Sequence, residues 1–384
     1  MSARAPKKIL VVFGTRPEAI KLAPVVKALE GEPDRFAVVS CVTGQHREML
    51  DEMIRAFELR PQIDLSLMKP GQTLPDLTAR AITRISEVLA EVRPDFTIVQ
   101  GDTTTAMTAA LASFYARVPV GHVEAGLRTA DRFNPFPEEI NRRIVGTVAD
   151  VHFAPTLSAA RALLNEGVAA RDVLVTGNTV IDALLMAAAR APANEPRFGH
   201  RPRYILVTAH RRESFGMPIR RVCEALRRIA ARHPDLAVVY PVHPNPEIRG
   251  PVRELLGHAE GIHLLEPLGY LDFVTHLRGA HFVVTDSGGV QEEAPALGKP
   301  VLVVRDTTER PEAVEAGVAR LVGTSVHRIV GAVDELLTRP GVYAGMARAT
   351  NPFGDGHASA RIVNALKARL FEHALHPREL EVSP

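Results

Sequence analysis

The sequence predicts an α/β fold of two Rossmann-like, doubly wound domains, each with a parallel sheet between layers of helices. Three observations support this prediction. Short apolar runs alternate with longer stretches of helical periodicity, the alternation begins again midway along the chain, and 384 residues exceed what one hydrophobic core usually serves.

Seven short apolar runs rich in β-branched residues are the expected strands. Each is followed by a turn rich in Gly, Pro, Thr or Ser and then by a helix-compatible segment such as 19–29 or 104–115. The expected strands are residues 9–13, 96–99, 118–123, 205–208, 237–240, 281–285 and 301–304.

The second half of the chain resembles the first. KILVVFGTRPE at 8–18 has a counterpart in YILVTAHRRE at 204–213, and VQGDTTT at 99–105 has one in VTDSGG at 284–289. The doubling predicts two domains that face each other, residues 1–177 and residues 178–359. Because open parallel sheets bind ligands at the carboxyl ends of their strands, the turns should line a common cleft.

Composition excludes several classes of protein. The chain has 46 Lys and Arg against 44 Asp and Glu, and this net charge of +2 indicates neither a nucleic acid nor an anionic membrane as partner. Cys41 and Cys223 are the only cysteines, which excludes a disulfide framework and a four-cysteine metal site. The short basic N-terminus lacks a signal-peptide core and no apolar run approaches 18 residues, so we expect a cytoplasmic protein.

The run DSGGVQEE at 286–293 is the candidate anion site. Gly288 and Gly289 allow backbone N–H groups to approach a phosphate or diphosphate closely at a predicted helix start, and Ser287 adds a hydroxyl donor. Glu292 and Glu293 could accept hydrogen bonds from a ribose diol. The alternative is a glycine-tightened turn followed by solvated glutamates.

Two arginines strengthen the diphosphate interpretation. Arg16 in GTRPE and Arg310 in RDTTERPE both lie in strand-to-helix turns, where a guanidinium can bind two phosphate oxygens. Either arginine could instead pair with a helix carboxylate.

The absence of several motifs narrows the range of candidate ligands. The sequence has no G-x-G-x-x-G, no complete Walker A loop, no Tyr with Lys four positions later, no H-E-x-x-H and no Asp-x-Asp. We therefore expect neither a redox cofactor nor a metal.

Three carboxylates follow predicted strands of the first domain: Asp102, Glu124 and Glu138. Carboxylates close together in a partly dry cleft cannot all ionise easily, so at least one pKa rises and an acid/base pair results. As alternatives, Asp102 could cap the helix that begins near Thr103, and Glu124 could pair with Arg128.

His210 ends the first strand of the second domain, in the turn that lies opposite the Arg16 turn in the doubled pattern. It could contact a leaving phosphate or carry a proton. A lone histidine at a strand end could also be structural.

Six ordered motifs resemble those of the non-hydrolysing bacterial UDP-N-acetylglucosamine 2-epimerases, over about residues 9–365. They are FGTRPEAIK (13–21), GDTTT (101–105), GHVEAGLR (121–128), TAHRRES (208–214), TDSGGVQEEAP (285–295) and RDTTERPE (305–312).

The resemblance implies a fold of the glycosyltransferase B type, with the last helix, about 360–384, packing back on the first domain, and usually a homodimer. It implies that UDP is eliminated across C1 and C2 in the anti sense. The product, 2-acetamidoglucal, would stay bound until UDP returns to C1 and a proton reaches the other face of C2. The partners would be UDP-N-acetylglucosamine and UDP-N-acetylmannosamine.

The resemblance also implies residue roles. Asp102, Glu124 and Glu138 would be the acid/base carboxylates, in an order left open, and His210 would handle the diphosphate. The UDP-binding set would be Arg16, Lys21, Phe273, Ser287, Gly288, Gly289, Glu293 and Arg310.

Some relatives are activated by a second UDP-N-acetylglucosamine molecule. The residues that match this allosteric site are Gln45, Gln72, Glu138, Arg211 and His243. Gly71 departs from the pattern, because some activated members have a basic residue there.

Three other functions fit part of the sequence. A glycosyltransferase would share the fold and the nucleotide, a hydrolysing epimerase would release UDP, and a UDP-sugar sensor would have lost catalysis. The resemblance implies that the product supplies precursors of a bacterial surface polysaccharide, whether enterobacterial antigen, teichoic-acid linkage or capsule.

Overall fold

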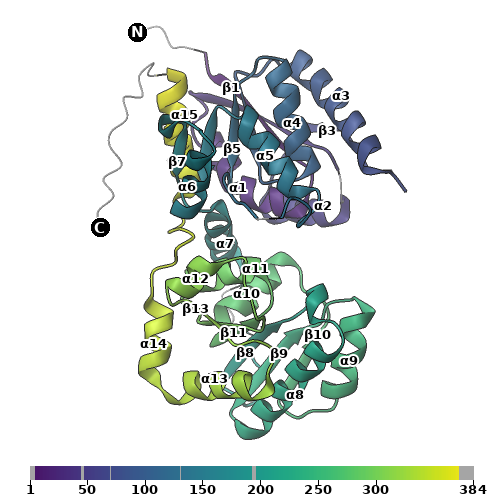
Figure 1. Ribbon diagram of the computed structural model, residues 1–384, viewed down its shortest axis with the longest axis vertical. Coiled ribbons are helices and arrows are strands. Elements are labelled where there is room, and N and C mark those ends of the chain that lie inside the picture. Colours follow the sequence, from purple (N-terminus) through teal and green to yellow (C-terminus); the bar gives the residue numbers. More distant parts are fainter. Residues whose placement is uncertain (1–4, 45–46, 70, 130, 193–195, 372–384) are drawn as a thin grey trace. The chain divides into compact units, whose positions relative to one another are not determined.

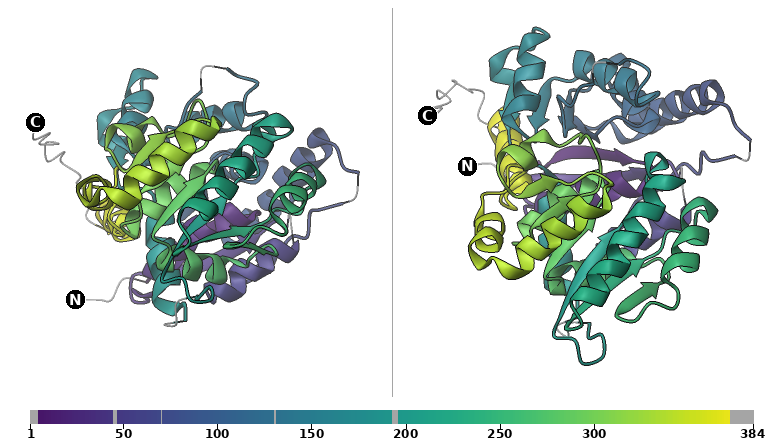
Figure 2. Two further views of the ribbon diagram at one scale, coloured as in Figure 1. Left: turned by 90° about the horizontal axis from the view of Figure 1, so that it is seen from below. Right: turned by 60° about the horizontal axis from the view of Figure 1, so that its bottom comes forward.

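The computed structural model describes residues 5–44, 47–69, 71–129, 131–192 and 196–371. The contacts divide the chain into two compact units, which we describe separately. Unit 1 is Met1–Ala183 with Phe353–Pro384, and unit 2 is Leu184–Pro352. Figures 1 and 2 show the strands of each sheet lying between helices.

Unit 1 contains a seven-stranded parallel sheet in the order β3-β2-β1-β4-β5-β6-β7. Its strands are β1 Lys7–Phe13, β2 Phe36–Val42, β3 Ile63–Asp64, β4 Phe96–Gln100, β5 Val120–Val123, β6 Val151–Ala154 and β7 Val173–Val175. The run from Ile9 to Phe13 is fully buried, because β1 lies inside a parallel sheet that is covered on both faces.

The helices of unit 1 follow their strands in a βα alternation. They are α1 Arg16–Glu30, α2 Arg47–Ala56, α3 Leu74–Val92, α4 Thr104–Tyr115, α5 Glu138–Val148, α6 Leu157–Asn165, the first part of α7 Thr179–Arg190, and α15 Ala358–Phe371.

The C-terminal helix α15 belongs to unit 1 (yellow in Figure 1). It packs against α1, and the Phe371 ring meets Phe36 edge to face at 5.7 Å. The Asp182 carboxylate accepts hydrogen bonds from the Ala358 and Ser359 amides at 3.2 and 2.8 Å, which satisfies two donors at the start of α15.

Unit 2 contains a six-stranded parallel sheet in the order β10-β9-β8-β11-β12-β13. Its strands are β8 Arg203–Thr208, β9 Leu236–Pro241, β10 Ile262–Leu265, β11 Phe282–Thr285, β12 Val301–Val303 and β13 Ala319–Leu321. Its helices are α8 Met217–Arg232, α9 Pro246–Leu256, α10 Tyr270–Gly279, α11 Gly288–Ala296, α12 Pro311–Glu315, α13 Val326–Thr338 and α14 Pro340–Arg348.

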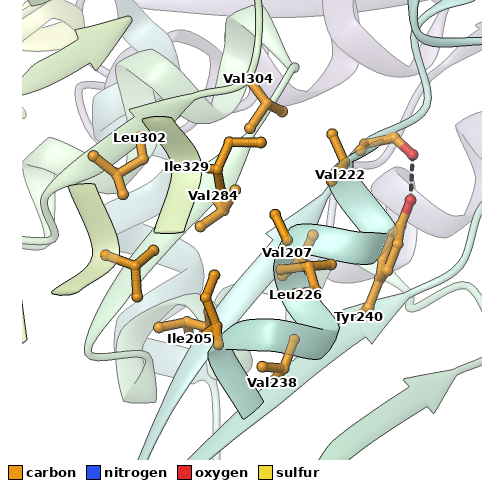
Figure 3. Packing of buried hydrophobic residues seen from close by; sticks show 14 of the residues in the cluster. Ile205, Val207, Val222, Leu226, Val238, Tyr240, Val284, Leu302, Val304 and Ile329 are labelled. Atoms are coloured by element: carbon orange, nitrogen blue, oxygen red, sulfur yellow. Dashed lines mark hydrogen bonds between the residues drawn. The ribbon is translucent and has the colours of Figure 1, made fainter. Parts of the chain in front are cut away.

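The core of unit 2 joins its sheet to α8 and α13 (Figure 3). Val207 and Val284 from neighbouring strands pack with Leu226 of α8 and Ile329 of α13, all fully buried. Burying each such side chain stabilises the fold by about 1.5–3 kcal/mol. The Tyr240 hydroxyl is satisfied inside this core by a 2.6 Å hydrogen bond to a backbone carbonyl.

The predicted fold class of two doubly wound α/β domains is confirmed. The seven expected strands and both expected helices are present. In each sheet the strand order reverses beside the first strand, between β1 and β4 in unit 1 and between β8 and β11 in unit 2. Ligands of such sheets bind at this switch point, at the carboxyl ends of the strands.

Within the described ranges, no helix is long and apolar enough to span a membrane. The same part of the chain holds no cluster of three or more His, Cys, Asp or Glu side chains suited to a metal ion.

Two buried histidines, His122 of β5 and His152 of β6, are register partners in the sheet of unit 1. The Nε2 atom of His122 lies 2.7 Å from the Gly101 carbonyl oxygen. Burial lowers the pKa of His122 to about 3 and that of His152 to about 4. Both imidazoles are therefore neutral in the folded protein at neutral and mildly acidic pH.

Acidification should destabilise the protein through these histidines. In the unfolded chain a histidine gains its proton near pH 6.5, so each contributes stability that is present above that pH and lost as the pH falls toward the folded-state pKa. The loss is about 1.4 kcal/mol per pH unit for each group. His152→Phe should therefore reduce the drop in unfolding free energy between pH 7 and pH 5 by about 2 kcal/mol. Urea unfolding of the wild type and of His152→Phe at both pH values measures this difference. Equal drops in unfolding free energy in the two proteins would contradict the prediction.

Candidate active site

The predicted site residues lie at the carboxyl ends of central strands in each sheet. In unit 1, Asp102 follows β4 and Glu124 follows β5, while Arg16 begins α1 after β1. In unit 2, His210 follows β8 and Ser287 follows β11. The doubly wound topology brings each of these two groups together at the edge where such sheets bind ligands.

Glu124 is a buried carboxylate surrounded by polar side chains that bind it. Both of its oxygens lie 2.6 Å from Lys21 Nζ, Gln100 Nε2 donates to one of them, and Asn178 Nδ2 donates to the other at 3.0 Å. Its backbone φ is +61°, a left-handed conformation that costs a non-glycine residue free energy. The surrounding hydrogen bonds hold this conformation.

The alternative pairing of Glu124 with Arg128 is wrong. The Arg128 guanidinium donates instead to both carboxylate oxygens of Glu166, at 2.8 and 2.6 Å. Lys21, which the resemblance places among the UDP-binding residues, is the cation that neutralises Glu124 in this structure.

Asp102 forms an ion pair with Arg142 of α5 and is also affected by the negative charge of Glu124. Burial raises the pKa of the Asp102 carboxyl, Arg142 opposes that rise and the negative charge of Glu124 adds to it. Asn141 fixes the same turn by donating to the Asp102 carbonyl at 3.0 Å. The alternative role of Asp102 as a helix cap is wrong, because the Thr103 hydroxyl caps α4.

Glu138 is the first residue of α5 and is partly exposed. Its carboxylate makes no hydrogen bond or ion pair within the described residues, and the start of a helix favours a negative charge. The neighbouring Glu139 is fully buried and accepts hydrogen bonds from Thr129 N at 3.0 Å and Arg143 Nε at 2.8 Å. Of the two glutamates, Glu138 is the one available to a ligand.

Glu18 connects the turn that carries Arg16 with the turn that carries Asp102. Its buried carboxylate accepts hydrogen bonds from Gly14 N at 3.0 Å, Thr15 N at 2.8 Å and Thr103 Oγ1 at 2.7 Å. Burial raises the pKa of Glu18, and these three donors oppose the rise. Sequence reasoning did not select Glu18, although the spacing of Thr15 and Glu18 is that of a capping box.

Gly14 must be glycine because its turn is in close contact with its neighbours. A Cβ atom there would collide with the hydroxyls of Thr43 and Thr105, which hydrogen-bond each other at 2.9 Å. The close approach keeps the β1–α1 turn against the start of α4.

Ser287, Gly288 and Gly289 form the start of α11 in unit 2. The Ser287 side chain makes no capping bond, so its hydroxyl is not used to satisfy the helix start. A Cβ on Gly288 would lie 3.3 Å from a guanidinium nitrogen of Arg211. The first N–H groups of α11, the helix dipole and Arg211 together suit an anion.

Arg310 pairs with a helix carboxylate, as the alternative interpretation expected. Its Nε donates to Glu292 of α11, and one terminal nitrogen donates to the Glu309 carbonyl at 3.0 Å. Glu292 and Glu293 are buried, so the alternative of solvated glutamates is wrong.

Phe273 lies in the first turn of α10 and is partly exposed.

His210 lies at the end of β8 with its side chain 38% exposed. Its ring stacks on His243 with centroids 5.3 Å apart and an angle of 14° between the planes. Its Nδ1 lies 3.8 Å from Asp286 Oδ1. Burial lowers the pKa of His210, and the Asp286 carboxylate opposes that change.

Comparisons with known proteins decide the family. The UDP-N-acetylglucosamine 2-epimerase family profile matches residues 27–367. This chain belongs to that family. The UDP-N-acetylglucosamine 2-epimerase of Escherichia coli is 52% identical over 370 residues, which cover 94% of this chain and 98% of the relative.

Solved structures of this epimerase family share the fold. One from Listeria monocytogenes has a TM-score of 0.92 at 46% identity and covers 98% of this chain and all of its own. The UDP-GlcNAc 2-epimerase of Neisseria meningitidis, solved bound to UDP-GlcNAc, has a TM-score of 0.84 at 44% identity, covering 94% of this chain and 99% of its own. The glycotransferase of kitacinnamycin shares the fold alone, with a TM-score of 0.63 at 14% identity, 94% coverage of this chain and 100% of its own.

These findings confirm the resemblance that the six motifs indicated and the glycosyltransferase-like fold that it implies.

Two residues of the predicted allosteric site, Gln72 and Arg211, have partners inside their own units in this epimerase-family protein. The Gln72 side-chain oxygen accepts from Arg80 and from Lys69 N at 3.1 Å, and Arg211 pairs with Glu309 at 3.5 Å. Gln45 lies outside the described residues.

Removing the Glu18 carboxylate should destabilise unit 1. Glu18→Ala would leave two buried backbone donors and the Thr103 hydroxyl without their acceptor, which should lower the free energy of unfolding by about 3 kcal/mol. The matched control is Glu30→Ala on the same helix, where an exposed Lys27–Glu30 pair at 3.1 Å contributes less than about 0.5 kcal/mol. Urea unfolding of the wild type, Glu18→Ala and Glu30→Ala tests this prediction. Similar losses of unfolding free energy in both variants would disprove the role of Glu18.

Proposed function

We propose that this protein interconverts UDP-N-acetylglucosamine and UDP-N-acetylmannosamine by inverting the carbon that carries the acetamido group. The observation that carries the proposal is the pair of carboxylates at the ends of the adjacent strands β4 and β5. Burial raises the pKa of the Asp102 carboxyl, and Glu124 is paired with Lys21, so the two carboxylates have different surroundings.

Direct removal of the C2 hydrogen would be very costly because no carbonyl group is adjacent to C2. Elimination avoids this cost: a carboxylate takes the C2 proton while the C1–O bond breaks and its electron pair leaves with UDP. The resulting 2-acetamidoglucal is neutral. UDP then returns to C1 and a second carboxylic acid gives a proton to the other face of C2.

The two units would supply different parts of this chemistry. Unit 1 would carry the proton-transfer groups Asp102, Glu124 and Glu138. Unit 2 would bind UDP through Ser287, Gly288, Gly289, Glu293 and Arg310, with Phe273 beside the uracil and His210 at the diphosphate, while unit 1 adds Arg16 and Lys21. Because the reaction is reversible, the carboxylate that is the base in one direction is the acid in the other.

Relatives support the choice of ligand. The Neisseria meningitidis structure is bound to UDP-GlcNAc, and a Methanocaldococcus jannaschii epimerase was solved in complex with UDP-GlcNAc and UDP at 34% identity and a TM-score of 0.74. A homodimer and the supply of surface-polysaccharide precursors stay predictions from the resemblance, and a cytoplasmic location stays a prediction from the sequence.

Solvent exchange at C2 tests the proposal. Incubation with UDP-N-acetylglucosamine in deuterated water should place deuterium at C2 of both UDP-sugars, measured by NMR or mass spectrometry, without net release of UDP. A glycosyltransferase would leave the C2 hydrogen in place, and a hydrolysing epimerase would accumulate UDP. Either result would refute the proposal.

A pair of variants, one beyond each end of β4, localises the chemistry. Asp102→Asn should slow deuterium incorporation by about 10²–10⁴-fold while UDP binding, measured by calorimetry, stays close to wild type. Asp95→Asn is the control, because Asp95 precedes the same strand at its other end, where it pairs with Lys7 at 2.8 Å. Unchanged exchange in Asp102→Asn would remove Asp102 from the mechanism.

The allosteric role proposed for Gln45, Gln72, Glu138, Arg211 and His243 has a kinetic test. A reaction started with UDP-N-acetylmannosamine alone should show a lag that added UDP-N-acetylglucosamine abolishes. Progress curves that begin at full rate and do not respond to the glucose epimer would contradict activation, while the deuterium experiment would still test epimerisation.

A further inference from the structure

Asp286 is a buried carboxylate at the switch point of unit 2 to which none of the roles above has been given. It follows β11 and is fully buried. Its Oδ2 atom accepts three hydrogen bonds of 2.8 Å, from His210 N, Arg211 N and Ser214 Oγ. Its Oδ1 atom is buried and has no hydrogen-bond partner within the described residues.

The unsatisfied oxygen of Asp286 lies toward His210. The distance from Asp286 Oδ1 to His210 Nδ1 is 3.8 Å, so a small rotation of the partly exposed imidazole closes a hydrogen bond. A buried carboxylate oxygen without a donor is costly, and an N–H on Nδ1 removes that cost. The other charged or titratable groups near the ring are His243, which stacks on it, and Arg211, which pairs with Glu309.

We propose that Asp286 is a positioning residue that holds His210 in the tautomer protonated at Nδ1 and turns Nε2 toward the ligand. The inference rests on the proposed function, in which His210 contacts the diphosphate. When Nε2 also carries a proton, the imidazolium has a carboxylate behind it. His210 can then donate a hydrogen bond to the phosphate oxygen that leaves C1 with the bonding electron pair.

Asp286 also holds the loop after β8, and two variants separate this role from its effect on the imidazole. Asp286→Asn keeps one acceptor oxygen for the three loop donors but replaces the other oxygen with an NH₂ group, which cannot accept from Nδ1. Ser214→Ala removes one loop bond and leaves the carboxylate and His210 unchanged.

Nitrogen-15 NMR of the histidine side chains reads the tautomer directly, without substrate. The signals of His210 are identified by their absence in His210→Gln. The wild-type protein should show Nδ1 protonated and Nε2 unprotonated at high pH, and Asp286→Asn should shift the proton to Nε2. Ser214→Ala should keep the wild-type tautomer.

Kinetics supply the second measurement. Asp286→Asn should lower kcat at least about tenfold, change KM little and move the pH dependence of kcat to lower pH, because the imidazolium loses its counter-charge. Ser214→Ala should retain the wild-type kcat and pH profile.

The proposal is overturned if wild-type His210 is protonated at Nε2, or if the two variants alter kcat and the pH profile alike. If Asp286→Asn fails to fold, the wild-type tautomer decides alone. Failure of the wild-type protein to epimerise UDP-N-acetylglucosamine would refute the proposed function but leave the tautomer measurement valid.

Discussion

In both units a buried carboxylate joins the two turns at the switch point. Glu18 of α1 binds the turn after β1 and the start of α4 after β4. Asp286, which follows β11, binds the turn after β8. In unit 1 the carboxylate comes from the helix that follows the first strand, β1. In unit 2 it comes from the turn after β11, the strand beside the first strand, β8. In both units it connects the turn after the first strand with the turn after the neighbouring strand. The positions of Arg16, Asp102, His210 and Ser287 depend on these two groups.

Burying a carboxylate costs several kcal/mol unless donors replace its water. Glu18 and Asp286 each have three donors, and the bonds to backbone N–H groups are charge-assisted. Glu124 is compensated differently, by a lysine and two amides. Carboxylates of one chemical type thereby differ in their partners: Glu18 and Asp286 are held by hydrogen bonds of the turns that they join, whereas Glu124 and Asp102 each have a cationic partner.

The sequence was sufficient to predict the fold because the central strands are continuous apolar runs, and 9–13 and 282–285 are fully buried. The predicted strands leave out β2, β3, β6, β7, β10 and β13. Of these, β3, β7 and β13 have two or three residues and β10 is partly exposed along its length, whereas β2 and β6 are mostly buried and were missed as well. The positions of Asp102 and Glu124 at strand ends were predictable from motif and topology. Their partners were not, because Lys21 is 103 positions from Glu124 and Arg142 is 40 from Asp102. Such pairs are fixed by tertiary packing, and one sequence does not record them.

The chain leaves unit 1 after Ala183 and returns to it at Phe353, and α15 then packs on α1. During synthesis unit 2 emerges complete while unit 1 still lacks its last helix. Until that helix arrives, the face of α1 near Phe36 and the Asp182 carboxylate have no cover. Unit 1 is therefore completed only after unit 2 has been synthesised, and until then its uncovered apolar surface favours aggregation.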